Sequence, residues 1–207
     1  MENPSNFSLL ESLPRDLRVE ILSRVASSSR EDIRNCLTLS KRISTSVVDD
    51  QVFKRLNLRP QAMIPLVTYE GYYQLMEKCL KSGNPVAHYI EGIKLYFVQE
   101  STTMGLFHLQ KSAEGLYDNA TYLYGILMLF TGNRVEGKTF LRSLGWETSK
   151  RRGDRCWRQN KVFITVSYPD PDPALTDPTF YYPDPDSTPP DIRIGFGSNL
   201  GSNPDLG

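Results

Sequence analysis

Side chains that could do chemistry are few in this chain of 207 residues, and they are scattered along it. The two histidines, His88 and His108, fall in segments with helical periodicity, where a histidine is more often exposed or packed than a base. Carboxylates such as Glu91 and Glu114 form no pattern that favours acid–base catalysis. No phosphate-binding loop, zinc-ligand spacing, nucleophile elbow or dinucleotide fingerprint occurs. The sequence therefore predicts a non-catalytic protein without cofactor or metal.

The cysteines and the apolar segments bear on the compartment. Cys36, Cys79 and Cys156 are far apart and odd in number, which favours structural thiols in a reducing environment. No apolar run reaches the ~18 residues that a membrane span needs. The polar start at 1–4 lacks the basic flank and apolar core of a signal peptide. We expect a protein of the nucleus and/or cytoplasm that has no membrane partner.

Charge and proline are concentrated at the C-terminal end. Residues 168–207 hold seven Asp and one Arg, for a net charge of −6, which leaves +6 on residues 1–167. The same stretch holds nine of the 14 prolines and repeats the pattern Tyr-Pro-Asp-Pro-Asp. Few apolar groups remain there to offset the entropy of ordering. We therefore predict a disordered, acidic, Pro-rich tail over 168–207.

The first ~50 residues have the periodicity of short helices, and the first helix opens in the run Leu13-Pro14-Arg15-Asp16-Leu17. Pro14 suits a first helical turn because its missing N–H has no partner there. Asp16 favours the positive end of the helix dipole. An apolar stripe follows at i, i+4 and i+8, with one more residue widening it: Leu17, Ile21 and Val25, with Leu22.

Two more helices are predicted in this module. Ser29 with Asp32 resembles a capping box, so the second helix should start near Arg30, and the third carries Ile43 and Val47. Helices this short bury too little surface to be stable alone, since fewer than ~70 residues rarely form a strong core. Either the module packs on the rest of the chain, or part of its apolar surface is an interface.

These residues resemble an F-box over residues 9–56: Leu13-Pro14-x-Asp16-Leu17, then Ile21-Leu22 and Val25, then Leu39-Ser40-Lys41. Members of that family often carry Trp or Phe where this chain has Ile43. The resemblance implies docking onto the Skp-type adaptor of cullin-RING ubiquitin ligases. The contact residues that it implies are Leu13, Pro14, Leu17, Ile21, Leu22, Val25, Leu37, Ser40 and Lys41. The alternative, that positions such as Ile21, Val25 and Leu37 are simply core, stays open.

Residues 66–148 contain an internal repeat. The segment 87–97 aligns with 120–130 at a constant offset of 33, with identical Ala, Tyr, Gly, Ile and Phe, and a second helical stretch follows each copy. A period of this size built from two helices is typical of an α-solenoid. The sequence therefore predicts an all-α protein: an N-terminal three-helix F-box module, a short α-solenoid of helix hairpins, and the disordered tail.

The repeats resemble tetratricopeptide and Sel-like repeats, through Lys111-Ser112-Ala113-Glu114-Gly115 followed by Ala120 and Gly125. An F-box joined to such repeats resembles a family of plant F-box proteins. That resemblance implies a substrate-recognition adaptor of a Skp–cullin–F-box (SCF) E3 ubiquitin ligase, whose repeats bind an unknown protein substrate. The alternative is a ligase-independent helical-repeat scaffold that the F-box-like segment merely caps.

A basic segment covers residues 149–167. Six cations and one acid lie between Lys150 and Lys161, which is most typical of a solvated basic loop. The alternatives are contact with nucleic acid, a nuclear-localisation segment, or pairing with the acidic tail. Nucleic-acid binding is the weakest of the hypotheses, because Trp157 is the single aromatic residue among the cations. The β-branched run at 161–168 predicts a short strand or an extended segment laid on the helices.

Overall fold

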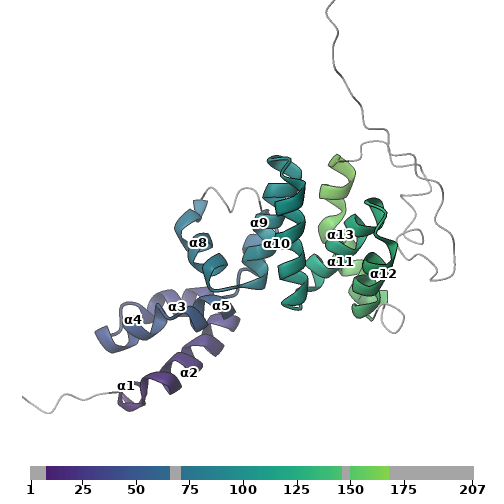
Figure 1. The fold of residues 1–207 in the computed structure, drawn as a ribbon. Coiled ribbons are helices and arrows are strands. Elements are labelled where there is room, and N and C mark those ends of the chain that lie inside the picture. Colours follow the sequence, from purple (N-terminus) through teal and green to yellow (C-terminus); the bar gives the residue numbers. More distant parts are fainter. Residues whose placement is uncertain (1–7, 66–70, 146–149, 168–207) are drawn as a thin grey trace, which may run out of the picture. The chain divides into compact units, whose positions relative to one another are not determined.

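The computed structural model describes residues 8–65, 71–145 and 150–167. Every regular element within these residues is helical, as the sequence predicts. The chain divides into two units, Met1–Asp170 and Pro171–Gly207, and the described residues all belong to the first. The elements, shown in Figure 1, are α1 (Leu9–Ser12), α2 (Arg15–Ser28), α3 (Arg30–Cys36), α4 (Lys41–Val47), α5 (Asp50–Arg55), α6 (Arg59–Ala62), α8 (Tyr73–Lys81), α9 (Pro85–Ile93), η1 (Lys94–Val98), α10 (Thr102–Glu114), α11 (Asp118–Phe130), α12 (Arg134–Ser143) and α13 (Lys150–Ser167).

Polar side chains cap the starts of α1, α3, α4 and α5 in the N-terminal module. The hydroxyl of Ser29 accepts from the N–H of Asp32 at 3.1 Å, so α3 begins at Arg30 as predicted. Asp49 plays the same part for α5, where its carboxylate accepts from Gln51 at 3.1 Å. Such caps satisfy N–H groups that have no partner inside a helix. The three predicted helices correspond to α2, α3 and α4, while α1 and α5 are additional elements.

The core of this module is aliphatic. Ile43, where F-box proteins often carry an aromatic ring, is only 3% exposed and therefore belongs to the core of this chain. The smaller side chain still contributes to burial, which favours folding by about 25 cal/mol per Å² of apolar surface. The other buried aliphatic side chains of α2–α5 are Val19, Leu22, Ala26, Ile33, Val47 and Val52.

The repeats form two helix hairpins, one from α9, η1 and α10 and one from α11 and α12. A glycine in the first helix of each hairpin faces a leucine in the second. A Cβ added to Gly92 would lie 2.8 Å from Leu109 Cγ, and one added to Gly125 would lie 2.8 Å from Leu141 Cγ. Both distances are too short for any other residue without movement. The predicted repeat is therefore a repeat of packing as well as of sequence.

A second pair of close approaches runs in the opposite direction. Gly105 of α10 lies against Tyr96, whose backbone nitrogen would be 2.7 Å from an added Cβ. Gly137 of α12 lies against Leu129, the residue 33 positions after Tyr96, with 2.9 Å to its Cδ2. Each hairpin is thus closed by two glycines, one on each helix. This close approach explains why small residues recur at these positions.

The hairpins differ by one residue, and a π-helix coincides with the difference. Phe97 and Gly105 are eight positions apart, whereas the equivalent Phe130 and Gly137 are seven apart. In the first hairpin η1 (Lys94–Val98) has π-helical hydrogen bonding, while α11 runs as one α-helix. A π-helical turn holds one more residue than an α-helical turn, so it can absorb a single insertion without moving the helix that follows.

Asn84 joins the N-terminal module to the repeats. Its side-chain oxygen accepts from the N–H groups of Val86 and Ala87, which caps α9. Its side-chain N–H₂ donates to the carbonyl oxygens of Phe53 and Leu56, at 2.9 Å each. The residue is 1% exposed, so all these bonds form away from water. One buried amide therefore connects the start of the first hairpin with the end of α5.

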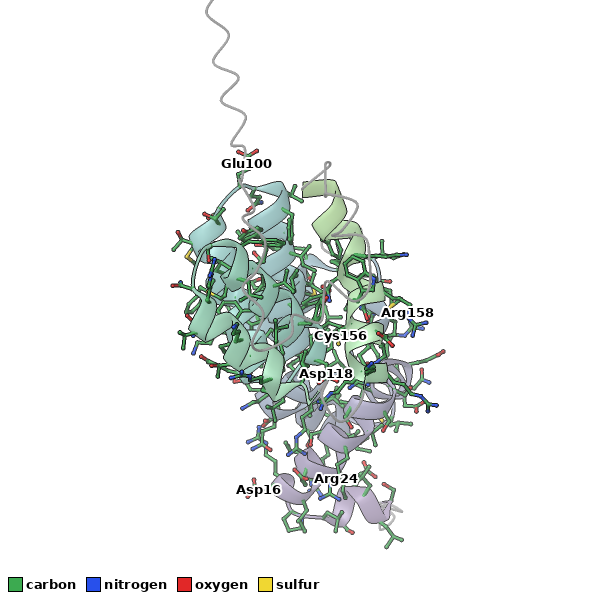
Figure 2. The ribbon with its side chains drawn as sticks, turned by 90° about the vertical axis from the view of Figure 1, so that its right-hand side faces the viewer. Asp16, Arg24, Glu100, Asp118, Cys156 and Arg158 are labelled. Atoms are coloured by element: carbon green, nitrogen blue, oxygen red, sulfur yellow. The ribbon has the colours of Figure 1, made fainter. Side chains whose placement is uncertain are left out.

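The basic segment is a helix, so the expectation of a loop followed by a strand or extended segment is wrong. Residues 150–167 form α13, and Gly153, Cys156 and Asn160 are buried along one face. In Figure 2 Cys156 lies between α13 and its neighbours, while Arg158 points away from them. The packing of this face on α11 overrides the β-preference of the apolar residues near the end.

Three parts of the predicted domain organisation lie outside the described residues. They are 66–70 and 146–149, at the ends of the predicted repeat region, and the predicted disordered tail at 168–207.

Candidate functional site

Helix α2 carries two apolar faces, and the candidate site starts from the outer one. Val19, Leu22 and Ala26 are at most 4% exposed and form the inner face. Leu17 and Ile21 remain 52% and 39% exposed. At 3.6 residues per turn these two side chains lie about half a turn from the inner face. An apolar pair opposite the core does not stabilise the isolated fold and is typical of a surface that a partner covers.

Arg18 holds the segment before α2 in place. Its guanidinium donates to the carbonyl oxygen of Leu13 at 2.5 Å, to that of Glu11 at 3.3 Å and to the hydroxyl of Ser46 at 3.3 Å. Ser46 belongs to α4 and is fully buried. Charge-assisted bonds of this kind are stronger than neutral ones. The position of Leu13 and Pro14, directly before the exposed stripe, is therefore tied to the core.

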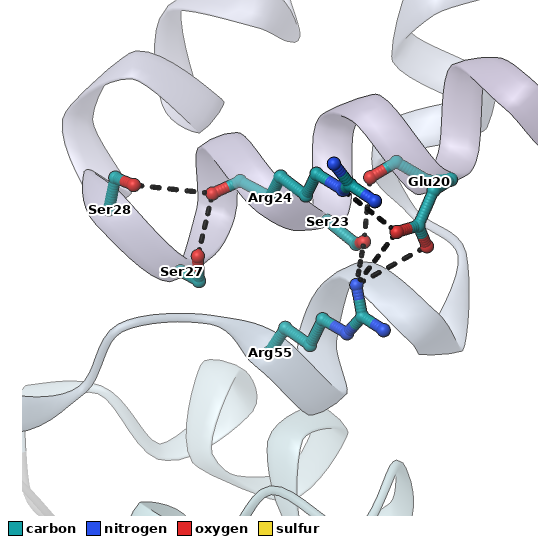
Figure 3. Close-up of polar contacts among 6 residues, drawn as sticks. All are labelled: Glu20, Ser23, Arg24, Ser27, Ser28 and Arg55. Atoms are coloured by element: carbon teal, nitrogen blue, oxygen red, sulfur yellow. Dashed lines mark hydrogen bonds and ion pairs between the residues drawn. The ribbon is translucent and has the colours of Figure 1, made fainter.

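A polar cluster on α2 fixes that helix against α5 (Figure 3). Arg55 donates to both carboxylate oxygens of Glu20 at 3.2 Å and to the hydroxyl of Ser23 at 3.1 Å. Arg24 bonds the same carboxylate at 2.9 Å. Hydrogen bonds from these two arginines to the carboxylate lower the pKa of Glu20. The cluster therefore links α2 to α5 through side-chain hydrogen bonds.

The junction between α3 and α4 contributes the other candidate residues. Leu37 follows the last turn of α3 and is 44% exposed. Ser40 caps α4, since its hydroxyl accepts from the N–H of Ile43 at 3.3 Å, and Lys41 is exposed beside it. The helices α2, α3 and α4 pack against one another. Ser40 therefore has a structural role that the sequence-based prediction as a contact residue did not include.

The structure divides the nine predicted contact residues by exposure. Leu22 is 1% exposed, so we correct its assignment from contact residue to core residue. Its burial follows from the turn of α2, which places it with Val19 rather than with Leu17. Leu13, Val25 and Ser40 are half-buried, and the exposed members are Pro14, Leu17, Ile21, Leu37 and Lys41, which we call the outer surface.

Two exposed apolar residues near this region are absent from the sequence-based set. Leu39 is 64% exposed in the turn between α3 and α4, and Val48 is 53% exposed at the end of α4. Leu39 directly precedes Ser40, so its place in a turn next to two predicted contact residues was a usable signal. Val48 gave no such signal, because it follows the buried Val47 and reads as a continuation of the apolar pattern.

Two histidines lie close together in the first hairpin. His88 and His108 meet across α9 and α10, with 3.0 Å between their Nδ1 atoms. Burial lowers the pKa of both, that of His88 to about 4. Burial also raises the pKa of Cys79 to about 12 and that of Cys156 to about 11, so neither thiol is reactive at neutral pH.

No group of three or more His, Cys, Asp or Glu side chains among the described residues could hold a metal ion. Within those residues, none of the helices has the length and apolar character required to cross a bilayer.

The comparisons agree with this architecture. The family model described as Plant tetratrico peptide repeats matches residues 60–165, about half of the chain. That range begins within α6 and runs through both hairpins into α13. No solved structure matches the chain.

The curated relatives are Arabidopsis thaliana proteins. F-box protein At2g35280 is 38% identical over 144 residues, which cover 70% of this chain and 88% of that protein. Putative F-box protein At1g67623 is 34% identical over 131 residues, 63% of this chain and 44% of that protein. F-box protein At1g67340 is 26% identical over 134 residues, 64% of this chain and 35% of that protein. The chain therefore belongs to the family of plant F-box proteins that carry tetratricopeptide-type helical repeats.

Proposed function

We propose that this protein is a substrate-recognition adaptor of an SCF ubiquitin ligase, with its outer surface docking on the Skp-type adaptor. The observation that carries the proposal is the exposed pair Leu17 and Ile21 on the face of α2 opposite the core. The names of the relatives support it, since three Arabidopsis relatives are named F-box proteins. In this proposal the repeats bind a protein substrate in the nucleus or cytoplasm.

The contribution of each exposed apolar residue to the free energy of docking is modest. Full burial of a Leu or Ile side chain contributes about 1.5–3 kcal/mol. Leu17 and Ile21 keep 52% and 39% of their surface exposed, so covering the rest contributes about 1 kcal/mol from each. Pro14, Leu37 and Lys41 extend the contact beyond α2. Apolar anchors at helical spacing with a polar margin suit a helical partner surface.

The proposed role is proximity. An adaptor raises the local concentration of a substrate lysine near a ubiquitin-loaded enzyme, and it supplies no reacting group. This role requires a docking surface and a substrate surface, and no acid, base or nucleophile. The neutral His88–His108 pair and the protonated thiols are compatible with such a protein.

A pull-down with the Skp-type adaptor tests the proposal. We expect the wild type to retain the adaptor, and both L13A/P14A and L17A/I21A to lose most of it. The matched control is M104A/F107A, which removes two apolar side chains of α10 that are similarly exposed, at 49% and 47%. Circular dichroism should show that all variants are folded. A wild type that never binds the adaptor would contradict the proposal.

The alternative is a ligase-independent scaffold in which the N-terminal module caps the repeats. The bonds from Asn84 to Phe53 and Leu56 favour it, as does the 3.1 Å bond from Ser82 to Asp50. Under this alternative, deletion of residues 1–56 unfolds the repeats and the wild type ignores the adaptor. Binding of the adaptor by the full chain separates the two functions, whatever the deletion does to stability.

A further inference from the structure

Helix α13 presents a basic stripe on the side opposite its buried face. Arg151, Arg155 and Arg158 recur at i, i+4 and i+7, and all three side chains are exposed. Gly153 and Cys156 are buried on the other side. With a rise of 1.5 Å per residue, the three α-carbons span about 10 Å along the helix. This set of three arginines is called the arginine stripe below.

The fold uses a different arginine for its own stability. Arg152 makes two bonds to the carboxylate of Asp118, at 2.8 and 2.6 Å, which tie α13 to the start of α11. Arg155 approaches the same carboxylate less closely, at 3.5 Å. Within the described part of the chain, Arg151 and Arg158 have no carboxylate within ion-pair distance. Two members of the arginine stripe are therefore not needed for the ion pairs that hold the helix.

The placement of these charges costs stability in the free protein. Like charges at i, i+4 and i, i+3 destabilise a helix by about 0.2–0.5 kcal/mol per pair. The stripe contains one pair of each kind, Arg151 with Arg155 and Arg155 with Arg158. Cations in the first turn, such as Lys150 and Arg151, also oppose the helix dipole. A bound anionic partner would offset both the repulsion between the arginines and their unfavourable interaction with the helix dipole.

We propose that the arginine stripe binds an acidic peptide segment of a protein substrate. Guanidinium groups bind carboxylates through paired hydrogen bonds, which a point charge cannot match. Successive arginines of the stripe are separated by about 6 and 4.5 Å along the helix axis. Alternate side chains of an extended peptide project on one side about 6.6 Å apart. A segment with Asp or Glu at alternate positions therefore places two carboxylates opposite Arg151 and Arg155, whose separation is close to that spacing.

The observations favour a peptide over a nucleic acid. Non-specific nucleic-acid binding uses a longer basic track with aromatic side chains on which bases stack. Here Trp157 is half-buried, and the ring of Phe163 stacks on Phe97 with 5.9 Å between centroids. Neither ring is presented beside the stripe as an open stacking surface. The formal net charge of the chain is also zero, which gives no general attraction to nucleic acid.

This inference deepens the proposed adaptor role and rests on it for its biological meaning, but the binding can be measured without the ligase. Fluorescence anisotropy would follow a labelled peptide with alternating Asp and Ser residues as it is titrated with the full chain. We expect R151Q/R158Q to weaken binding by about tenfold or more. The control R134Q/R142Q removes the same charge from exposed positions of α12 and should change affinity less than about twofold. A rise in salt should weaken binding by the wild type.

Two further experiments test whether binding depends on charge alone or also on the guanidinium geometry, and whether the ligand is a peptide or another anion. R151K/R158K keeps the charge but loses the planar fork, so its affinity should fall between those of the wild type and R151Q/R158Q. Equal binding by R151Q/R158Q and the wild type would overturn the proposal, as would equal loss in R134Q/R142Q. Stronger competition by single-stranded RNA than by unlabelled peptide would replace it with a nucleic-acid site. Binding seen only after removal of 168–207 would make this chain's own acidic segment the occupant.

The same proteins distinguish failure of this inference from failure of the adaptor role. R151Q/R158Q should still bind the Skp-type adaptor, because its changes lie outside the outer surface. Loss of adaptor binding in L17A/I21A with peptide binding intact would show that the two surfaces act independently. Adaptor binding by a wild type that ignores the acidic peptide would overturn only the present inference.

Discussion

The side-chain amide of Asn84 donates a hydrogen bond to the carbonyl oxygen of Leu56 at 2.9 Å, at a position where Asn84 is only 1% exposed. The same residue caps α9 through bonds from Val86 and Ala87. The last residues of the N-terminal module and the first helix of the repeats therefore depend on one side chain. The boundary between the two parts is a packed junction, not a flexible linker.

Replacing Asn84 should weaken both parts together. We expect N84A to lose about 2–4 kcal/mol of unfolding free energy, because the cap is lost and two buried carbonyl groups lose a donor. N84S keeps a cap acceptor and should lose about 1–2 kcal/mol. Urea unfolding measures both. Asn133 precedes α12 without a side-chain cap bond, so N133A should change stability by less than about 0.5 kcal/mol. Equal losses in N84A and N133A would contradict this reading.

The glycine contacts make a second prediction. In G105A the new Cβ would meet the backbone of Tyr96 at 2.7–2.8 Å, and backbone atoms cannot move aside as a flexible side chain can. We expect a loss of about 2–3 kcal/mol, measured as a shift of the thermal or urea midpoint. An added Cβ at Gly71 meets no atom of the described residues within 4 Å, so G71A is the control and should be close to neutral. An unchanged stability of G105A would show that the helices of the first hairpin are not packed closely at Gly105 and Tyr96.

Replacing Leu116 with glycine should increase the stability of the protein, in contrast to the two preceding substitutions. It follows α10 with φ of +62° and is 86% exposed, so a residue with a side chain occupies a left-handed position and contributes little packing. We expect L116G to gain about 1 kcal/mol, since the left-handed conformation costs that much for residues with a Cβ. Gly132 has φ of +88° after α11, so G132A should lose a similar amount. A stability loss in L116G would contradict this prediction.

The histidine pair predicts a pH dependence. Desolvation first, then the charges of His108 and Lys111, lower the pKa of His88 from 6.5 to about 4 in the folded state. Between these two values the unfolded chain binds more protons, so stability rises with pH over this window and is complete above about 6.5. Because His88 is partly exposed, we discount the effect to about 1–2 kcal/mol. The variant H88Q/H108Q should flatten this part of the stability profile, and an unchanged slope would contradict the assignment.

The faces of α2 show what sequence periodicity can and cannot give. Periodicity identified an amphipathic helix beginning at Leu13-Pro14, and the structure has one from Arg15. It assigned Leu17, Ile21 and Leu22 to one broad stripe, whereas the structure separates Leu22 from the other two. A helix with apolar residues on both sides gives no sequence signal for which side meets the core. Which face of α2 is buried depends on its tertiary packing against α4 and α5.

The sequence predicted the helix hairpins of the repeats but not the helix α13. The difference lies in whether the packing leaves a local pattern in the sequence. Gly92 and Gly125 recur because the close approach of the two helices in each hairpin leaves no room for a Cβ. This packing requirement is therefore visible as a repeated glycine in the sequence. In α13 the buried residues Cys156 and Asn160 are few and are surrounded by cations. Asn160 is helical because it bonds Tyr89 at 2.8 Å and the carbonyl group of Asn119 at 3.2 Å. Partners 71 and 41 residues away leave no local pattern.

Isothermal titration of the full chain with the Skp-type adaptor tests the central claim most directly. The proposed role predicts micromolar or tighter binding by the wild type, at roughly −8 kcal/mol or better. It predicts a loss of about tenfold to a hundredfold in L17A/I21A, with M104A/F107A within about twofold of the wild type. Absence of binding by the folded wild type, or equal affinity in L17A/I21A, would contradict the claim that the outer face of α2 is a docking surface.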